Sequence, residues 1–313
     1  MNYSEAMNIA LLESLGRQTP ILAFGQNIGA GSHLSGLTRG INDVVECEVF
    51  NTPNCENAEI GFGFGLMLEG AKCIFIVKQQ DFLLLGLDQL VNTANVAVGG
   101  EGMGSFTVAF VTVDSGYEGP QSRLNQFAEI CSLSGQPGYT VSSRQEAEFI
   151  LGHQVGAPGF RMIGFSQRLF REEVIHVPDA RLLDAESGAT CFVEAGGVVI
   201  VACNFALPQA LLLAERLRDV RNLACSVVSV PRVDSPMSES LAKYLSIHEK
   251  VAVLDDSHSR MGAGRLLVSE AVGRLCDASS IALFDRSGRS RDITPNGDAF
   301  EVPLQSVVEK LML

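Results

Sequence analysis

The feature that most constrains this chain is the alternation of two patterns along its length. Short apolar runs, rich in β-branched residues, alternate with segments whose apolar residues follow a helical period. In the first half, strands are expected at 19–25, 73–77, 106–113 and 159–163, and helices at 5–15, 56–68, 81–95 and 144–152. Because strands separated by helices pair in parallel, this order predicts an α/β fold with a parallel sheet covered on both faces.

The alternation stops at a charged, turn-prone stretch, residues 171–188, and then starts again. Strands are expected at 197–203, 224–230, 250–254 and 280–284, and helices at 206–217, 237–244 and 262–275. Ser235-Pro236 is expected to supply the N-cap and the first-turn proline of the middle helix. Since 313 residues are enough for two cores, we predict two α/β domains, residues 1–178 and 190–313.

Composition narrows the range of partners. The chain has 36 acidic and 23 basic residues and a net charge of -13, which repels phosphate backbones and anionic lipid heads, so nucleic acid and membranes are poor partners. No apolar run approaches the ~20 residues of a membrane span, and no basic leader with an apolar core follows Met1, so we predict a cytoplasmic protein. The eight cysteines include no C-x-x-C pair and the five histidines are scattered, so we expect neither a disulfide nor a metal site.

Residues 51–66 place one acidic side chain, Glu56, where a loop becomes an apolar helix. Thr52 precedes Pro53 and is therefore expected to be extended, and the alternating glycines and phenylalanines that follow leave a slim helix surface for close packing. Burial raises the pKa of a carboxyl group, so a buried Glu56 could share a proton with a ligand nitrogen. The alternative is an acid at a helix start that the helix dipole favours.

Other segments carry less chemistry. Residues 61–65, Gly-Phe-Gly-Phe-Gly, are not a dinucleotide-binding loop, because the third glycine of that motif falls on Leu66. No G-x-S-x-G sequence marks a nucleophilic serine. Residues 255–258, Asp-Asp-Ser-His, suggest either a small polar site or a solvated turn at a strand end, and the glycine-rich residues 26–32 suggest either a ligand crevice or a surface loop.

Two motifs stand out by their order and spacing, T-P-N-C-E at 52–56 and D-F-L-L-L-G-L-D-Q-L-V-N at 81–92. They resemble the T-P-I-x-E and D-F-x-x-x-x-x-D-Q-[IV]-x-N motifs of the beta subunits of the thiamine-diphosphate-dependent 2-oxo acid dehydrogenases. Residues 24–29, 167–171 and 235–236 are also similar to segments of that family. The resemblance therefore extends over nearly the whole chain.

The resemblance implies a fold and a cofactor. The first domain is expected to be the parallel-sheet, pyrimidine-binding domain of the transketolase-like fold, and the second a transketolase C-terminal-like α/β domain. Glu56 is expected to be the catalytic residue, hydrogen-bonding the aminopyrimidine ring of thiamine diphosphate. Ile28, Gln79, Gln80 and Phe82 are expected to line the pyrimidine side of the cofactor, although these positions equally suit core residues.

The chain departs from the family pattern in two places. Gln79 and Gln80 stand where the family has an aromatic residue before the D-F pair. Residues 119–122, Gly-Pro-Gln-Ser, stand where related subunits have H-S-Q-S, and they are also similar to the D-G-P-T-H loop of transketolases. Gln121 and Ser122 are therefore expected in a substrate loop without the family's histidine, which leaves the acceptor chemistry open.

The family's G-D-G motif, which holds magnesium and the diphosphate, is absent, since Gly297-Asp298 lacks its other elements. The resemblance thus implies a separate alpha subunit that carries the diphosphate and magnesium, in a complex of two alpha and two beta chains. The expected function is the beta subunit of an enzyme that decarboxylates a 2-oxo acid and transfers the resulting acyl or aldehyde unit. The alternatives are the C-terminal half of a split transketolase-type ketol transferase and a non-catalytic structural paralogue.

Overall fold

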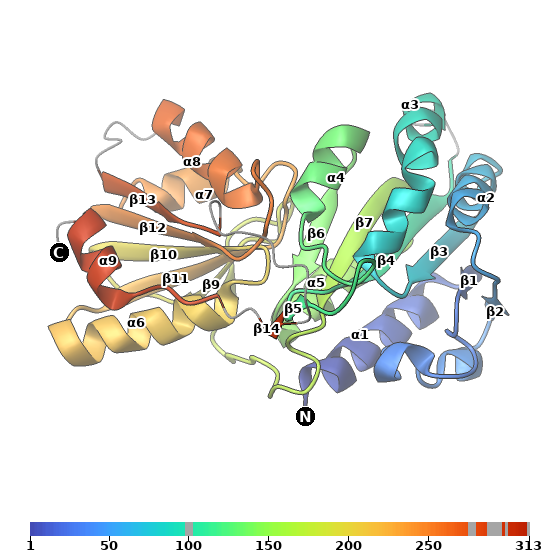
Figure 1. The fold of residues 1–313 in the computed structure, drawn as a ribbon, viewed down its shortest axis with the longest axis horizontal. Helices are drawn as coiled ribbons and strands as arrows, with labels where there is room; N and C mark the ends of the chain where they lie inside the picture. Colours follow the sequence, from blue (N-terminus) through green and yellow to red (C-terminus); the bar gives the residue numbers. More distant parts are fainter. Residues whose placement is uncertain (98–102, 275–279, 287–295, 298–299, 312–313) are drawn as a thin grey trace.

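The computed structural model describes residues 1–97, 103–274, 280–286, 296–297 and 300–311, which form two α/β units lying side by side (Figure 1). In both units, helices lie above and below a central sheet in this view, as the alternation of strands and helices predicts. Within these ranges, no helix combines the length and the apolar character needed to cross a membrane. The predicted α/β fold class is confirmed.

The first sheet has the strand order β2-β1-β3-β4-β7-β6, and its described neighbours pair in parallel. Its strands are β1 (Ile21–Gly25), β2 (Cys47–Asn51), β3 (Lys72–Val77), β4 (Ser105–Thr112), β6 (Gly138–Val141) and β7 (Gly159–Ser166). Its helices are α1 (Tyr3–Gln18), α2 (Glu56–Leu68), α3 (Ala94–Ala97), α4 (Phe127–Ser134) and α5 (Arg144–Gln154). Ile74 and Ile76 of β3 pack with α1 and α5, whereas Phe75 packs with α2 and α4, so both faces are sealed.

The second sheet has the order β13-β12-β10-β11-β9-β8, in which β9 pairs antiparallel with both β11 and β8. Its strands are β8 (Arg181–Leu182), β9 (Thr190–Val193), β10 (Val198–Cys203), β11 (Cys225–Val230), β12 (Lys250–Asp255) and β13 (Ile281–Phe284). Its helices are α6 (Leu207–Arg221), α7 (Glu239–Leu245), α8 (Ala263–Arg274) and α9 (Leu304–Leu311). A short pair, β5 (Gly116–Tyr117) with β14 (Asn296–Gly297), lies near the junction of the units (Figure 1).

The prediction of one long helix at 81–95 is wrong. The chain instead forms a 3-10 segment, η3 (Gln80–Gly86), followed by a π-helix, η4 (Gln89–Thr93), and by α3. Gly86 lies so close to α2 that a Cβ would come within 2.3 Å of Ile60 Cδ1, and the Asp81 carboxylate accepts hydrogen bonds from the backbone of residues 123 and 124. These tertiary contacts override the local helical pattern.

The predicted helix cap at Ser235-Pro236 is also wrong. Ser238 is the N-cap of α7, and its Oγ accepts from the Leu241 amide at 3.1 Å. At Val233 the backbone N–H still donates to the Gly138 carbonyl of the first unit, at 2.9 Å. The chain therefore runs along the first unit until just before this helix.

The charged, turn-prone stretch at which the alternation stops, residues 171–188, contains contacts to both units. Glu173 forms a β-bridge with Asn2, whereas β8 pairs with β9 of the second sheet. The passage from one unit to the other thus lies between these two contacts. The domain limits at residues 178 and 190 stay a prediction.

Candidate functional site

The topology of the first sheet points to one place for a ligand. The connection after β1 leads to β2 on one side, whereas the connection after β3 leads to β4 on the other, so the strand order reverses between β1 and β3. In open parallel sheets, ligands bind at such a switch point, outside the carboxyl ends of the strands. Gln26 directly follows β1, Gln79 follows β3, and Glu56 opens the helix after β2. These residues define the candidate site.

Glu56 is a buried acid at the start of a helix. Its side chain is 4% exposed, and Gln26 Nε2 donates a hydrogen bond to its Oε1 at 3.0 Å. The preceding residue, Cys55, is the N-cap of α2 and makes no side-chain cap hydrogen bond. Both features that the sequence suggested for Glu56, burial and a place at a helix start, are present together.

A second acid, Glu59, lies one turn further along α2 and was missed in the sequence. It is 4% exposed, and neither its carboxylate oxygens nor the nearby Thr52 hydroxyl makes a hydrogen bond of good geometry within the described residues. Burial raises the pKa of Glu59, the charge of Glu56 adds to the rise, and Thr52 offsets part of it. The spacing of three residues, which puts two side chains on one helix face, was the signal that could have revealed this pair.

Ile28 and Phe82 were expected beside the cofactor ring, and the structure buries the first side chain and leaves the second partly exposed. The Ile28 side chain is fully buried in the core that α1 and α5 share. Its carbonyl accepts from Thr38 Oγ1 at 2.8 Å, which fixes the turn after β1. Phe82, on η3, is partly exposed and packs against the core on the α2 side. Of the two, only Phe82 presents a surface to a ligand.

Gln80 was also expected beside the ring, but its amide is engaged within the protein. In the orientation that satisfies both of its ends, the amide nitrogen donates to Thr112 Oγ1 at 3.2 Å and to the Leu124 carbonyl at 3.3 Å. The amide oxygen accepts from the backbone N–H groups of Gln126 and Phe127, at 3.2 and 3.0 Å. The fully buried Gln80 therefore ties η3 to the chain that enters α4.

The two residues of the expected substrate loop lie beside η3. Ser122 Oγ donates to Gln79 Oε1 at 3.0 Å, and Gln121 is exposed. A β-bridge between Gly119 and Ser122 closes the tip of the loop. The structure thus brings Gln79 and Ser122 together and leaves Gln121 accessible.

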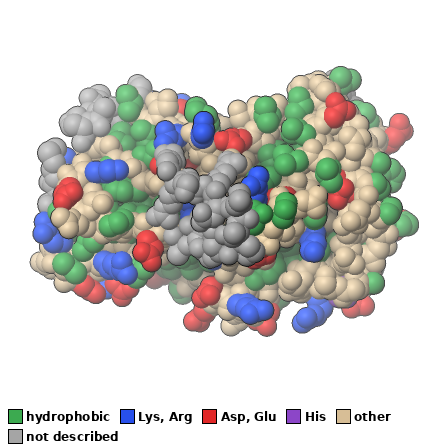
Figure 2. All heavy atoms as spheres, in the orientation of Figure 1, with side chains coloured by type: hydrophobic (Ala, Val, Ile, Leu, Met, Phe, Trp, Pro, Cys, Tyr) green, Lys and Arg blue, Asp and Glu red, His purple; other side chains and the backbone are tan. Residues whose placement is uncertain are grey.

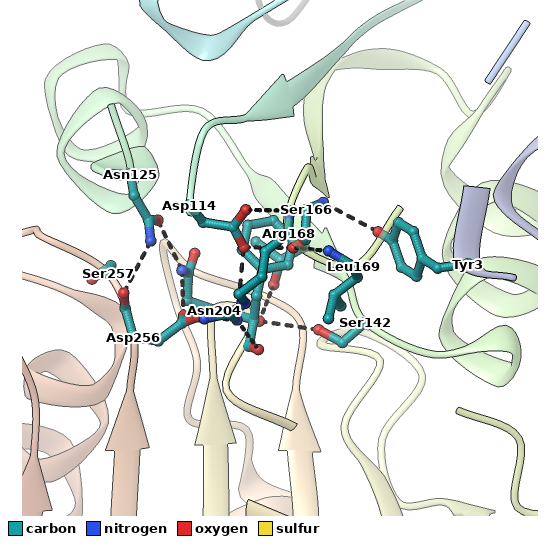
Figure 3. Close-up of polar contacts among 12 residues, drawn as sticks. Tyr3, Asp114, Asn125, Ser142, Ser166, Arg168, Leu169, Asn204, Asp256 and Ser257 are labelled. Carbon is teal, nitrogen blue, oxygen red and sulfur yellow. Dashed lines mark hydrogen bonds and ion pairs between the residues drawn. The ribbon is translucent and has the colours of Figure 1, made fainter. Parts of the chain in front are cut away.

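The second sheet has a switch point of its own, between β10 and β12, and side chains of the first unit fill it (Figure 3). Arg168 donates to Asp256 Oδ2 at 2.6 Å, and Asn204 Nδ2 donates to Asp256 Oδ1 at 2.7 Å and to Asn125 Oδ1 at 2.9 Å. Asp256 is fully buried, so the solvated-turn interpretation of residues 255–258 is wrong. The other carboxylate of the run, Asp255, accepts from the Gly264 amide in the first turn of α8 at 2.8 Å.

The same cluster reaches back to the strand that carries the loop. Asp114, which follows β4, accepts from the Arg168 amide at 2.9 Å and from the Ser166 hydroxyl. Burial raises the pKa of Asp114 and the negative charge of Asp256 adds to the rise, while the Arg168 guanidinium lowers it. Arg168 lies between the two carboxylates and lowers the cost of burying both, so this crevice serves domain docking.

Comparison with known proteins gives a likeness in sequence. No protein-family model matches the chain. The mitochondrial 2-oxoisovalerate dehydrogenase subunit beta 2 of Arabidopsis thaliana is 25% identical over 236 residues, which are 74% of this chain and 65% of that protein. The pyruvate dehydrogenase E1 component subunit beta of Acholeplasma laidlawii is 24% identical over 241 residues, which are 75% of this chain and 72% of that protein. The resemblance to the beta subunits of 2-oxo acid dehydrogenases is confirmed.

Solved structures show the fold of this chain. A split-gene transketolase, described as an inactive beta4 tetramer, aligns with 100% of this chain and 97% of its own, with a TM-score of 0.72 and 17% identity. Transketolase from Campylobacter jejuni aligns with 99% of this chain but 44% of its own, with a TM-score of 0.69 and 12% identity. The fold is transketolase-like over the whole chain.

The chain spans only part of the length of the first curated relatives. It aligns with 65% of the Arabidopsis subunit and with 24% of the 2-oxoisovalerate dehydrogenase subunit beta of Chaetomium thermophilum, to which it is 31% identical over 113 residues. The alignments therefore show a likeness to beta subunits, whereas the reaction is proposed from the residues of the site.

Proposed function

We propose that the chain is the beta subunit of a thiamine-diphosphate enzyme that decarboxylates a 2-oxo acid and transfers the resulting acyl or aldehyde unit. The observation that carries this proposal is the Glu56 carboxylate, buried at the switch point of the first sheet and held by Gln26 at 3.0 Å. The names of the relatives, beta subunits of 2-oxoisovalerate and pyruvate dehydrogenases, support the reaction class.

The residues around Glu56 fit the pyrimidine half of thiamine diphosphate. A carboxylate that is 4% exposed and bonded to a neutral amide is suited to share a proton with a ring nitrogen, because little water competes for it. When bound, the cofactor supplies the carbon nucleophile and accepts the electron pair that decarboxylation leaves. Within the chain, Glu56 would hold the proton at the ring nitrogen, Gln26 would orient the carboxylate, and Phe82 would offer an apolar wall.

The diphosphate half of the cofactor calls for a second chain. The described residues contain no group of three or more His, Cys, Asp or Glu side chains arranged for a metal ion, and Asp298 of the incomplete Gly297-Asp298 motif lies outside them. The net charge of -13 also opposes diphosphate binding by this chain alone. We therefore propose an alpha subunit that brings magnesium and the diphosphate site, in a complex of two alpha and two beta chains.

Exposed apolar side chains beside the site support a protein partner. Phe62 of α2 is 52% exposed, and Leu84 and Leu85 of η3 are 53% and 54% exposed. Figure 2 shows apolar side chains on the upper part of the first unit, where α2, α3 and α4 lie in Figure 1. Apolar surface of this kind next to a half-built site is typical of a surface that a second chain covers.

The test is reconstitution with the candidate alpha subunit, sought first in the neighbouring reading frame. We expect the chain alone to show no turnover and the complex to turn over a 2-oxo acid with thiamine diphosphate and magnesium. Glu56→Gln should lower kcat by about 100-fold or more, the usual weight of acid–base catalysis. The matched control is Glu69→Gln, an exposed acid at the other end of α2. Full activity of the Glu56 variant would refute the assignment.

A split transketolase-type transferase is the second candidate. It is favoured by the match to 97% of a split-gene transketolase chain and by Gly119-Pro120, which resembles the D-G-P-T-H loop of transketolases. Assaying the reconstituted complex with sugar phosphates against 2-oxo acids separates the two reactions. A structural paralogue is the third candidate, and calorimetry that detects no thiamine-diphosphate binding by the complex at any magnesium concentration would favour it.

A further inference from the structure

Consecutive residues after β3 form hydrogen bonds with the loop that follows β4. The Asp81 carboxylate accepts from the Arg123 amide at 3.2 and 3.4 Å, to its two oxygens, and from the Leu124 amide at 3.2 Å. One residue before Gln80, Gln79 accepts from the Ser122 hydroxyl at 3.0 Å. The three loop residues that directly follow Gln121 are thus each tied to the same short segment.

Gln80, which lies between Gln79 and Asp81, adds hydrogen bonds to the same loop from its buried side. Gln80 binds the carbonyl of Leu124 and the amides of Gln126 and Phe127, so the loop is held on its inner side until α4 begins. The 3-10 geometry of η3 explains why neighbouring side chains can bind different parts of the loop. A helix of this kind has three residues per turn, so successive side chains point to different sides.

Asp81 is the charged member of this set. It is 7% exposed; burial raises its pKa, and the amides of Leu124 and Arg123 lower it. Hydrogen bonds to an ionised carboxylate are stronger than those between neutral groups, so the hydrogen bonds to Asp81 should hold the loop more firmly than the one to Gln79. Further from α4, Glu118 accepts from Gln167 Nε2 at 3.2 Å on the exposed surface.

We propose that Asp81 is a positioning residue that sets the orientation of the loop carrying Gln121 and Ser122, and thereby the binding of substrate. This inference rests on the proposed function, in which that loop meets the 2-oxo acid. Asp81 acts through the backbone of residues 123 and 124 and touches neither cofactor nor substrate. Its loss should therefore weaken substrate binding and leave cofactor binding as it was.

Limited proteolysis of the full chain can measure how firmly Asp81 holds the loop, and it needs no activity assay. Arg123 is exposed, and the peptide bond that trypsin cleaves after it contains the Leu124 N–H that Asp81 binds. In limited trypsin digestion followed by mass spectrometry, Asp81→Ala should speed cleavage at 123–124 by about tenfold. Asp81→Asn keeps one acceptor oxygen and should lie between. Asp88→Ala, an exposed acid that binds only Asn92 among the described contacts, is the control and should leave the rate unchanged.

The positioning role is then read in the reconstituted complex. We expect KM for the 2-oxo acid to rise by about tenfold in Asp81→Ala and less in Asp81→Asn, with a smaller change in kcat and an unchanged calorimetric Kd for thiamine diphosphate. Faster cleavage without a change in KM would overturn the inference, as would an unchanged cleavage rate or an equal loss of cofactor affinity. Failure of the proposed function shows elsewhere, as full activity of Glu56→Gln or as absence of cofactor binding by the wild-type complex.

Discussion

The alternating glycines of α2 allow a sharp test of how the helix that begins at Glu56 is seated. Gly63 faces the sheet, and a Cβ there would lie 2.2, 2.3 and 2.7 Å from three ring carbons of Phe106. That ring is fully buried and packs against Phe64 and Phe160, each with a centroid distance of 5.2 Å. Since the ring cannot turn aside, Gly63→Ala must push α2 away from β4.

The size of the effect follows from two opposed terms. Overpacking a core costs about 1–3 kcal/mol, and the closeness of three ring atoms places Gly63→Ala at the upper end. Replacing glycine by alanine inside a helix returns about 0.5–1 kcal/mol. We therefore expect a net loss of about 2 kcal/mol. Gly65 is exposed with nothing within 4 Å of its Cβ position, so Gly65→Ala should gain about 0.5–1 kcal/mol.

The assay is urea unfolding followed by far-ultraviolet circular dichroism, with both variants measured beside the wild type. The two single-methyl changes on one helix should shift the midpoint in opposite directions and differ by about 3 kcal/mol. Because a displaced α2 carries Glu56 with it, Gly63→Ala should also weaken thiamine-diphosphate binding by the reconstituted complex. A Gly63→Ala variant as stable as Gly65→Ala would refute this account of the packing.

Two further predictions concern buried charge. Arg168→Met should lower the free energy of unfolding by about 3–5 kcal/mol at pH 7.5, because Asp114 and Asp256 are left buried without their cation, and by less at pH 5, where a carboxyl can protonate. Urea titrations at both pH values test this beside Arg181→Met, whose ion pair is exposed and worth less than about 1 kcal/mol, and a loss no larger than the control's would contradict it. Burial raises the folded-state pKa of Glu59, so the contribution of Glu59 to stability is fully present below its unfolded-state pKa and is lost as pH rises through the folded-state pKa. Glu59→Gln should match the wild type at pH 4 and exceed it by about 1 kcal/mol at pH 8, and parallel pH profiles of the two proteins would rule this out.

Sequence patterns predicted many of the longer buried elements, because burial imposes the apolar period, but the short buried elements α4, β6 and β9 were not predicted. The helix at 56–68 has the predicted limits, and the preceding proline explains why it does not start earlier. In contrast, β2 was not predicted, since it is an edge strand with Glu48 and Phe50 exposed and has no buried run. The prediction for segment 81–95 failed although its apolar residues follow a helical period. Contacts with α2 and with the loop after β4 determine the conformation of its backbone instead.

The site was predictable only where a local motif defines it. Glu56 follows a proline-containing loop and opens a helix, so its place could be read from neighbouring residues. Its partner Gln26 lies 30 residues away, and only the sheet order brings the two together. Gln80 was expected beside the cofactor because it precedes the D-F pair, yet its partners lie more than 30 residues further along the chain. Long-range hydrogen bonds of this kind leave no period in the sequence.

The same rule of sheet geometry acts twice in this chain, with opposite results. Both sheets reverse their strand order, and such a reversal is the place where open parallel sheets form a crevice at the carboxyl ends of their strands. In the second crevice, Asp256 receives the Arg168 guanidinium from the first unit, so its charge is balanced inside the chain (Figure 3). In the first crevice, the described partner of Glu56 is the neutral amide of Gln26, so its charge is left for a group from outside. A buried carboxylate without an internal cation is costly unless such a group arrives, and this cost supports the proposed role of Glu56 in holding a cofactor ring.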